Sequence, residues 1–273
     1  MSTAALDRRT LAAAFRELGL EPGDGVIVHS SFRSLRPVDG GPEAVIDALL
    51  DAVGERGNLM LPTFNYTTPL PEPYYDADAT PCRTGIIPEL GRRRPGAVRS
   101  LHPTHSVAVI GPDADALTRD HLSVRAIGAG SPIDRLAKAG GKVLLVGVGH
   151  ISNSTVHVAE EYAAIPKVSW YDPLPDVKMR MPDGRVVLHP LDASPSCSAA
   201  FGAAEHALRR RGRIRDLRIG PARCQLMTGR DVIELVGEII EEKPDVLLCT
   251  WLACRPCTGA RAGLRRQGRL PAP

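Results

Sequence analysis

The 273-residue chain is poor in aromatic residues, lacks long apolar runs and carries little net charge. Phe, Trp and Tyr make up 4% of it, and 34 basic against 31 acidic residues leave a formal charge of +3. No stretch approaches the ~20 apolar residues of a membrane-spanning helix, and the N-terminal residues lack the apolar core of a secretory signal. We therefore expect a cytoplasmic protein without a membrane partner.

Arginines are concentrated late in the chain, between Arg209 and Arg218 and again between Arg255 and Arg269. A surface that binds nucleic acid usually adds aromatic rings that stack on bases, and these two stretches contain none. We therefore favour a solvated face and predict no nucleic-acid partner. The alternative, an Arg-rich nucleic-acid binder, would bind with a steep dependence on salt.

Cysteine and histidine are sparse, and neither forms a complete metal motif. Six scattered cysteines do not make a disulfide framework, which favours a reducing compartment. Cys249, Cys254 and Cys257 form a C-x4-C-x2-C cluster without an obvious fourth ligand, so we expect free thiols there, with a zinc site as the alternative. His102 and His105 flank a proline and lack a carboxylate or cysteine partner, which favours a loop turn. We expect no metal requirement.

Apolar periodicity predicts alternating strands and helices, the order of an α/β protein. The predicted strands cover residues 25–29, 58–61, 107–110 and 142–148, the predicted helices cover 10–20, 42–53, 155–164, 199–211 and 229–242, and residues 177–181 and 185–188 are predicted to form a hairpin. Residues 62–81 show no periodicity and are expected to form a long loop. We predict an α/β fold: a single mixed-sheet domain flanked by helices over residues 1–245, with a small Cys- and Arg-containing C-terminal extension over 246–273.

The stretch from Gly147 to Glu161 is the strongest local candidate for a catalytic site. A predicted central strand ends in glycines, a Ser/Asn/Thr cluster can cap the next helix, and His157 lies near the start of that helix. Glu160 at i+3 shares a helix face with His157, so its carboxylate can fix the imidazole tautomer and leave the other nitrogen as a base. The alternative is a polar capping cluster with a surface histidine. A dinucleotide motif is disfavoured because its third glycine is missing.

Five segments in this order resemble the aminoglycoside 3-N-acetyltransferase family, also called the antibiotic N-acetyltransferases. They are residues 28–35 (VHSSFRSL), 61–66 (LPTFNY), 99–107 (RSLHPTHSV), 128–132 (GAGSP) and 147–161 (GVGHISNSTVHVAEE). The similarity continues to about residue 242. It implies a mixed α/β fold distinct from that of the GCN5-type acetyltransferases.

The resemblance also implies a reaction and a set of site residues. The donor would be acetyl-CoA and the acceptor a primary amine, the 3-amino group of an aminoglycoside or an amine of a related natural product. His157 would act as general base, oriented by Glu160, and Tyr66 and Glu161 would contact the acceptor. The residues implied for the coenzyme are His29, Ser30, Ser31, Arg33, Ser34, Leu35, Thr104 and Ser106.

A second function stays open from the sequence. A pI of about 8.6 does not favour a polycationic acceptor, which would be drawn to an acidic cleft. The alternative is therefore a CoA-binding protein of the same fold that acts on a different amine or lacks transfer activity. The partners expected in either case are coenzyme A and a small molecule, and a homodimer is one candidate for the oligomeric state.

Overall fold

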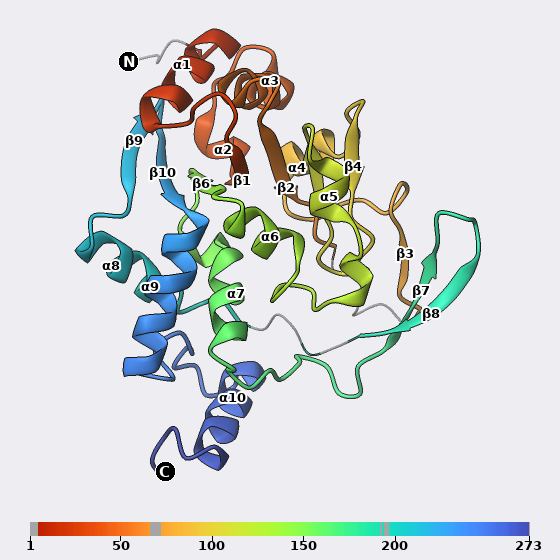
Figure 1. Cartoon of the computed structure of the whole chain (residues 1–273), viewed down its shortest axis with the longest axis vertical. Helices are drawn as coiled ribbons and strands as arrows, with labels where there is room; N and C mark the ends of the chain where they lie inside the picture. The colour runs from red at the N-terminus through yellow and green to blue at the C-terminus, as the bar shows by residue number, and fades with distance from the viewer. Residues whose placement is uncertain (1–4, 66–71, 192, 194–196, 273) are drawn as a thin grey trace.

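A seven-stranded mixed sheet runs through the middle of the protein, with strand order β4-β5-β2-β1-β6-β10-β9 (Figure 1). The computed structural model describes residues 5–65, 72–191, 193 and 197–272. The three central strands are parallel and the four outer ones pair antiparallel. The bounds of the strands in this sheet are β1 (Gly25–Ser30), β2 (Asn58–Pro62), β4 (Ala97–Arg99), β5 (Val107–Ile110), β6 (Lys142–Val146), β9 (Arg215–Ile219) and β10 (Ala222–Thr228).

Helices cover both faces of the sheet, which explains why its central strands are continuously apolar. On β1, Val26 and Val28 pack toward α1 and α3, whereas Ile27 packs toward α6, α7 and α9 on the opposite face. The helices are α1 (Arg8–Leu18), α2 (Phe32–Leu35), α3 (Gly41–Val53), α4 (Ile86–Gly91), α5 (Ala114–Thr118), α6 (Pro132–Lys138), α7 (Thr155–Tyr162), α8 (Gly202–Arg210), α9 (Gly229–Glu242) and α10 (Arg255–Arg266), with 3-10 turns η1 (His121–Ser123) and η2 (His150–Ser152).

The parallel strands end at the same edge of the sheet. β2 ends at Pro62, β1 at Ser30 and β6 at Val146, and the backbone N–H of Ser31 donates to the Val146 carbonyl at 2.9 Å as the two chains diverge. Carboxyl ends of parallel strands are where open α/β sheets bind ligands, because the loops that leave them can surround a crevice.

A second, smaller sheet contains β3 (Tyr74–Asp76), β7 (Asp176–Arg180) and β8 (Val186–Pro190). The predicted hairpin forms, with β7 antiparallel to β8. β3 pairs parallel with β7, so the prediction of a loop throughout 62–81 is wrong at this point. Three residues are too few to show a period of two, but Tyr75 is fully buried against Val177 and Met179, and this packing holds the strand.

The segment after residue 245 packs on the rest of the protein through α10. Leu247, Leu248, Cys254, Cys257, Ala260 and Leu264 belong to the core cluster that also contains α7 and α9. A domain boundary at residue 245 stays a prediction. Two glycines of α10 allow its close approach: a Cβ at Gly259 would lie 2.7 Å from Val168, and one at Gly263 would lie 2.6 Å from Pro166.

No helix in the described part of the chain combines the length and apolar character needed to cross a bilayer.

Candidate active site

A cavity of about 550 Å³ opens at the carboxyl ends of the parallel strands. His29 and Ser30 reach it from the end of β1, and Thr104 from the loop before β5. His157 reaches it from the first turn of α7, after a polar stretch that also lines it, residues 152–154. Four of the sequence-predicted residues, from three distant segments, are thus brought together.

His157 is held in one orientation by Glu160. The imidazole Nδ1 lies 2.7 Å from Glu160 Oε2, and the Glu160 side chain is fully buried. A carboxylate can only accept a hydrogen bond, so Nδ1 carries a proton and, in the neutral ring, Nε2 is the nitrogen with the lone pair. The ring of Phe201 packs edge-on against the imidazole, with 4.7 Å between centroids. Together these two contacts restrict the imidazole.

Lys167 completes this group and was not found from the sequence. Its Nζ lies 3.2 Å from the same Glu160 oxygen, and its side chain is 7% exposed. Burial opposes ionisation of Glu160, but Lys167 and His157 outweigh burial and hold the pKa of Glu160 below its ordinary value. Lys167 lies beyond the end of α7, and the chain turns back through Ala164 at φ 51° to bring it there. No helical spacing could reveal that pairing.

The other two histidines of the cavity are neutral near pH 7. Burial, with a smaller contribution from His150, lowers the pKa of His29 to about 3. Burial likewise lowers the pKa of His105 to about 3, with a smaller contribution from His157. Nε2 of His29 and Oγ of Ser30 have no hydrogen-bond partner within the described residues. Buried polar atoms are rarely left unpaired, so these two are free to meet a ligand or solvent.

The remaining residues predicted for the coenzyme do not line the cavity. Ser34 Oγ donates to the Gly147 carbonyl at 3.1 Å and lies 3.0 Å from Ser31 Oγ, which ties the short helix α2 to the residue that follows β6. Arg33 is exposed and Leu35 is fully buried in the core on the α1 side. Ser106 is fully buried behind the cavity wall.

Of the two residues predicted for the acceptor, only Glu161 lies in the described part of the chain, and it does not line the cavity. Tyr66 lies outside the described residues. Glu161 forms an ion pair with Arg125, 2.7 Å from Nε to Oε1, and is not among the lining residues. The sequence analysis missed Trp170 and Tyr171, which line the cavity and are 44% and 40% exposed. They follow α7 in a stretch without periodicity, and only their aromatic character could have marked them.

Comparisons with known proteins identify the family of this chain. A family model described as aminoglycoside 3-N-acetyltransferase matches residues 27–241. Aminoglycoside N(3)-acetyltransferase VII of Streptomyces paromomycinus is 34% identical over 86% of this chain and 92% of its own length, and enzyme IV of a Salmonella species is 33% identical over 79% and 80%. The chain belongs to the aminoglycoside 3-N-acetyltransferase family. It is accordingly an acyltransferase, as the sequence predicted.

Solved structures of the aminoglycoside 3-N-acetyltransferase family share the fold. A histidine-to-alanine variant of AAC(3)-IVa in complex with a gentamicin superposes with a TM-score of 0.84 at 29% identity, over 96% of this chain and 99% of that one. AAC-IIIb with CoASH superposes with a TM-score of 0.76 at 26% identity, over 88% and 98%. The predicted mixed-sheet α/β fold is confirmed.

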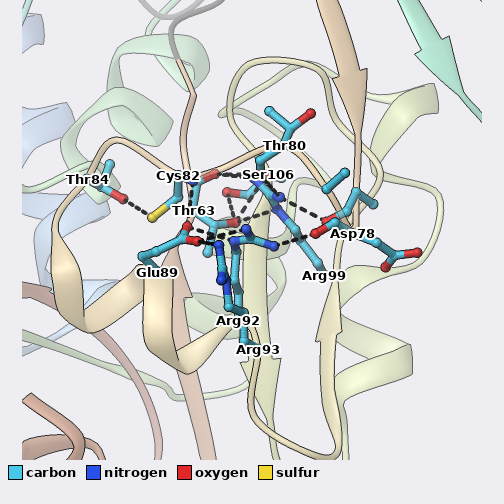
Figure 2. Close-up of polar contacts among 12 residues, drawn as sticks. Thr63, Asp78, Thr80, Cys82, Thr84, Glu89, Arg92, Arg93, Arg99 and Ser106 are labelled. Atoms are coloured by element: carbon cyan, nitrogen blue, oxygen red, sulfur yellow. Dashed lines mark hydrogen bonds and ion pairs between the residues drawn. The ribbon is translucent and has the colours of Figure 1, made fainter.

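Arginines that do not line the cavity join the segment after β3 to the sheet (Figure 2). Arg99, at the end of β4, donates to the Thr63 and Ser106 hydroxyls at 3.2 and 3.0 Å, and to the carbonyls of Thr63, Ala77 and Thr80 at 2.9, 2.9 and 2.6 Å. Arg92 makes two 2.8 Å hydrogen bonds to Glu89. Partial burial opposes ionisation of Glu89, yet Arg92 lowers its pKa to about 2.

Replacement of Arg99 by methionine should destabilise the protein by about 2–3 kcal/mol, because several partly buried carbonyls would lose their donor together. Arg93→Met is the matched control. Its side chain is 61% exposed and pairs only with Glu89 among the contacts described, so the loss should stay within about 1 kcal/mol. Urea denaturation of both variants measures the difference. Equal stabilities would contradict the role given to Arg99.

The buried histidines should make the fold sensitive to acid. Burial lowers the pKa of five of them, and the unfolded chain binds their protons near pH 6.5, so unfolding takes up protons once the pH falls below that value. Each such histidine should reduce the free energy of unfolding by at most about 1.4 kcal/mol per pH unit, until the pH reaches its own folded-state pKa. The five are His29, His102, His105, His121 and His150.

Urea denaturation between about pH 7.5 and pH 5, above most carboxylate titration, measures this slope. His121→Gln removes one such group, buried between the Ser100 hydroxyl and the Ala126 carbonyl, and should flatten the slope. The exposed His206 serves as control, and His206→Gln should leave the slope unchanged. A free energy of unfolding that does not vary across this window would refute the prediction.

Proposed function

We propose that this enzyme transfers the acetyl group of acetyl-CoA to the 3-amino group of an aminoglycoside, with His157 as general base. The observation that carries the proposal is the 2.7 Å contact between His157 Nδ1 and a fully buried Glu160, on a histidine that lines the cavity. The contact leaves Nε2 as a proton acceptor.

In the reaction, one proton passes from the amine to His157 and then from His157 to the departing thiolate. The amine nitrogen attacks the thioester carbonyl carbon while His157 Nε2 takes a proton from it, giving a tetrahedral intermediate with charge on oxygen. The intermediate then collapses, the C–S bond breaks and the imidazolium returns the proton to the departing thiolate. The products are the acetylated amine and coenzyme A with its free thiol, and no covalent enzyme intermediate forms.

Among the histidines that line the cavity, His157 suits this role best. A general base is most effective when its pKa lies near the working pH, and the pKa of His29 and of His105 is about 3, which makes both weak bases. Glu160 would stabilise the imidazolium that forms, and Lys167 keeps Glu160 ionised before the reaction. Glu160 and Lys167 are therefore positioning residues.

The polar atoms at the end of β1 that have no hydrogen-bond partner among the described residues support a contact between this strand and the coenzyme. His29 Nε2 and Ser30 Oγ, with Thr104, would contact the pantetheine near the thioester. Ser31, Arg33 and Ser34 would continue along the coenzyme toward its phosphates, where an exposed guanidinium suits anionic oxygens. Leu35 and Ser106 are both fully buried and would support the residues that contact the coenzyme.

The acceptor would lie against Trp170 and Tyr171, whose half-exposed rings offer apolar faces to a sugar. The relatives support both ligands: AAC(3)-IVa was solved with a gentamicin and AAC-IIIb with CoASH. Glu161 stays a candidate acceptor contact only if its ion pair with Arg125 opens.

Incubation with acetyl-CoA and either gentamicin or apramycin, each of which has been solved in complex with AAC(3)-IVa, tests the proposal. Release of the coenzyme thiol should accompany a product heavier by one acetyl group, and NMR of that product should place the group on the 3-amino nitrogen. Coenzyme binding without thiol release across a panel of aminoglycosides and simple amines would instead favour the CoA-binding protein without transfer activity.

A further inference from the structure

Four cysteine side chains gather at one place, and none of them lines the cavity. The Sγ atoms of Cys197, Cys249, Cys254 and Cys257 all lie within 4.8 Å of one another. All four are free thiols, two buried and two half-buried. In the described part of the chain, this is the one group of three or more His, Cys, Asp or Glu side chains placed to share an ion.

We propose that these four cysteines bind one zinc ion with a structural role. Zinc in a tetrahedral site with Zn–S bonds of about 2.3 Å places its sulfur ligands about 3.8 Å apart. Sulfurs that lie within 4.8 Å of one another reach this geometry by moving inward about half an ångström each. Four sulfur ligands leave no open coordination position, which is typical of structural zinc sites.

The chain presents three of the ligands from one short stretch. Cys249, Cys254 and Cys257 have the spacings of two to four residues that zinc sites use. Cys254 is the N-cap of α10 and Cys257 lies in its first turn, where the positive end of the helix dipole favours thiolates. Cys197, from the segment before α8, is the fourth ligand that the sequence alone did not reveal.

Donors around the cluster suit a negatively charged metal site. The backbone N–H of Cys249 donates to Cys257 Sγ at 3.4 Å, and that of Ala199 donates to Cys197 Sγ at 3.4 Å. Arg261 donates to the Cys249 and Leu248 carbonyls at 2.8 and 2.7 Å. Zinc with four thiolates carries a net charge of about −2, which such N–H donors partly offset; the Arg261 guanidinium is itself paired with Asp245 at 3.2 Å.

The ion would tie α10 to the segment that forms one wall of the cavity. Ser198, next to Cys197 in the chain, lines the cavity, and Phe201 packs against the His157 ring. The zinc site does not take part in the reaction, and its existence does not depend on the reaction proposed above.

Metal analysis of the full-length protein, purified under reducing conditions, tests the proposal. We expect one zinc per chain in the wild type and loss of zinc to the level of the buffer in Cys197→Ser and in Cys257→Ser. Cys82 and Cys224 lie outside the cluster, so Cys82→Ser and Cys224→Ser should each keep one zinc. Zinc retained in Cys197→Ser and Cys257→Ser would overturn the assignment.

The wild type alone provides a second measurement, should the cluster variants fail to fold. Removal of zinc by a chelator under reducing conditions should lower Tm, zinc should restore it, and Co²⁺ in its place should give the visible bands of a tetrahedral thiolate site. Wild-type protein that takes up no zinc, that holds iron instead, or whose intact mass is lower by two hydrogens per disulfide among these cysteines would refute the proposal.

Discussion

His157→Ala should lower kcat by about 10²–10⁴-fold, the usual contribution of a general base, while coenzyme affinity stays nearly unchanged. The alanine removes the proton acceptor but leaves His29, Ser30 and Thr104 in the cavity wall. Steady-state kinetics with acetyl-CoA and an aminoglycoside give kcat, and calorimetric titration with coenzyme A gives the affinity.

The matched control for this variant is His206→Ala. His206 is exposed on α8 and is not among the residues that line the cavity, so its removal should leave kcat unchanged. Circular dichroism and thermal unfolding establish that both variants fold. Full turnover by folded His157→Ala would eliminate His157 as the base and move attention to the other cavity histidines.

Glu160→Gln should lower kcat by between about 10²- and 10⁴-fold, because an amide can donate to Nδ1 and select the wrong imidazole tautomer. The imidazolium would also lose its carboxylate, so the acid limb of the pH profile of kcat should move to lower pH. A residue with only a structural role would not move that limb. The measurement is kcat against pH for the variant and the wild type.

Glu160→Gln also removes the ion-pair partner of Lys167, and a second substitution at Lys167 provides the control for this effect. The amide leaves a cation that is 7% exposed without its anion, and breaking a buried pair in this way costs about 3–5 kcal/mol. Glu160→Gln combined with Lys167→Met removes both charges and should recover most of that stability without recovering kcat. Recovery of kcat in the double variant would show that Glu160 serves folding and not the orientation of His157.

Much of the central sheet could be predicted because its strands are buried on both faces. β1, β2 and β6 are continuous apolar runs for that reason, and a run of this kind is visible in a sequence. β9 is an edge strand with the sequence RDLRI, in which three of the five residues are charged and exposed, and it carries no such signal. α10 was missed because arginines separate its few apolar residues, and only packing on Pro166 and Val168 shows which face is buried.

The residues of the candidate site also fall into those that the sequence could predict and those that it could not. His157 and Glu160 are three residues apart on one helix, so periodicity alone placed them together. Lys167 and Cys197 meet their partners only through the tertiary fold, one after a left-handed turn at Ala164 and the other from the segment before α8. Contacts between residues with no shared element leave no pattern along a single sequence.

Because α10 packs closely against residues 166–168, truncation of the chain before this helix should inactivate the protein. Gly259 and Gly263 press the helix against the stretch that carries Lys167, and Arg269 donates to the Ala163 carbonyl at 2.8 Å. A premature stop codon shortly after residue 250 would spare every residue that lines the cavity, yet it would remove the support behind the lysine. The acetyl transfer proposed above should therefore be lost from such a truncated product even though His157 is still encoded.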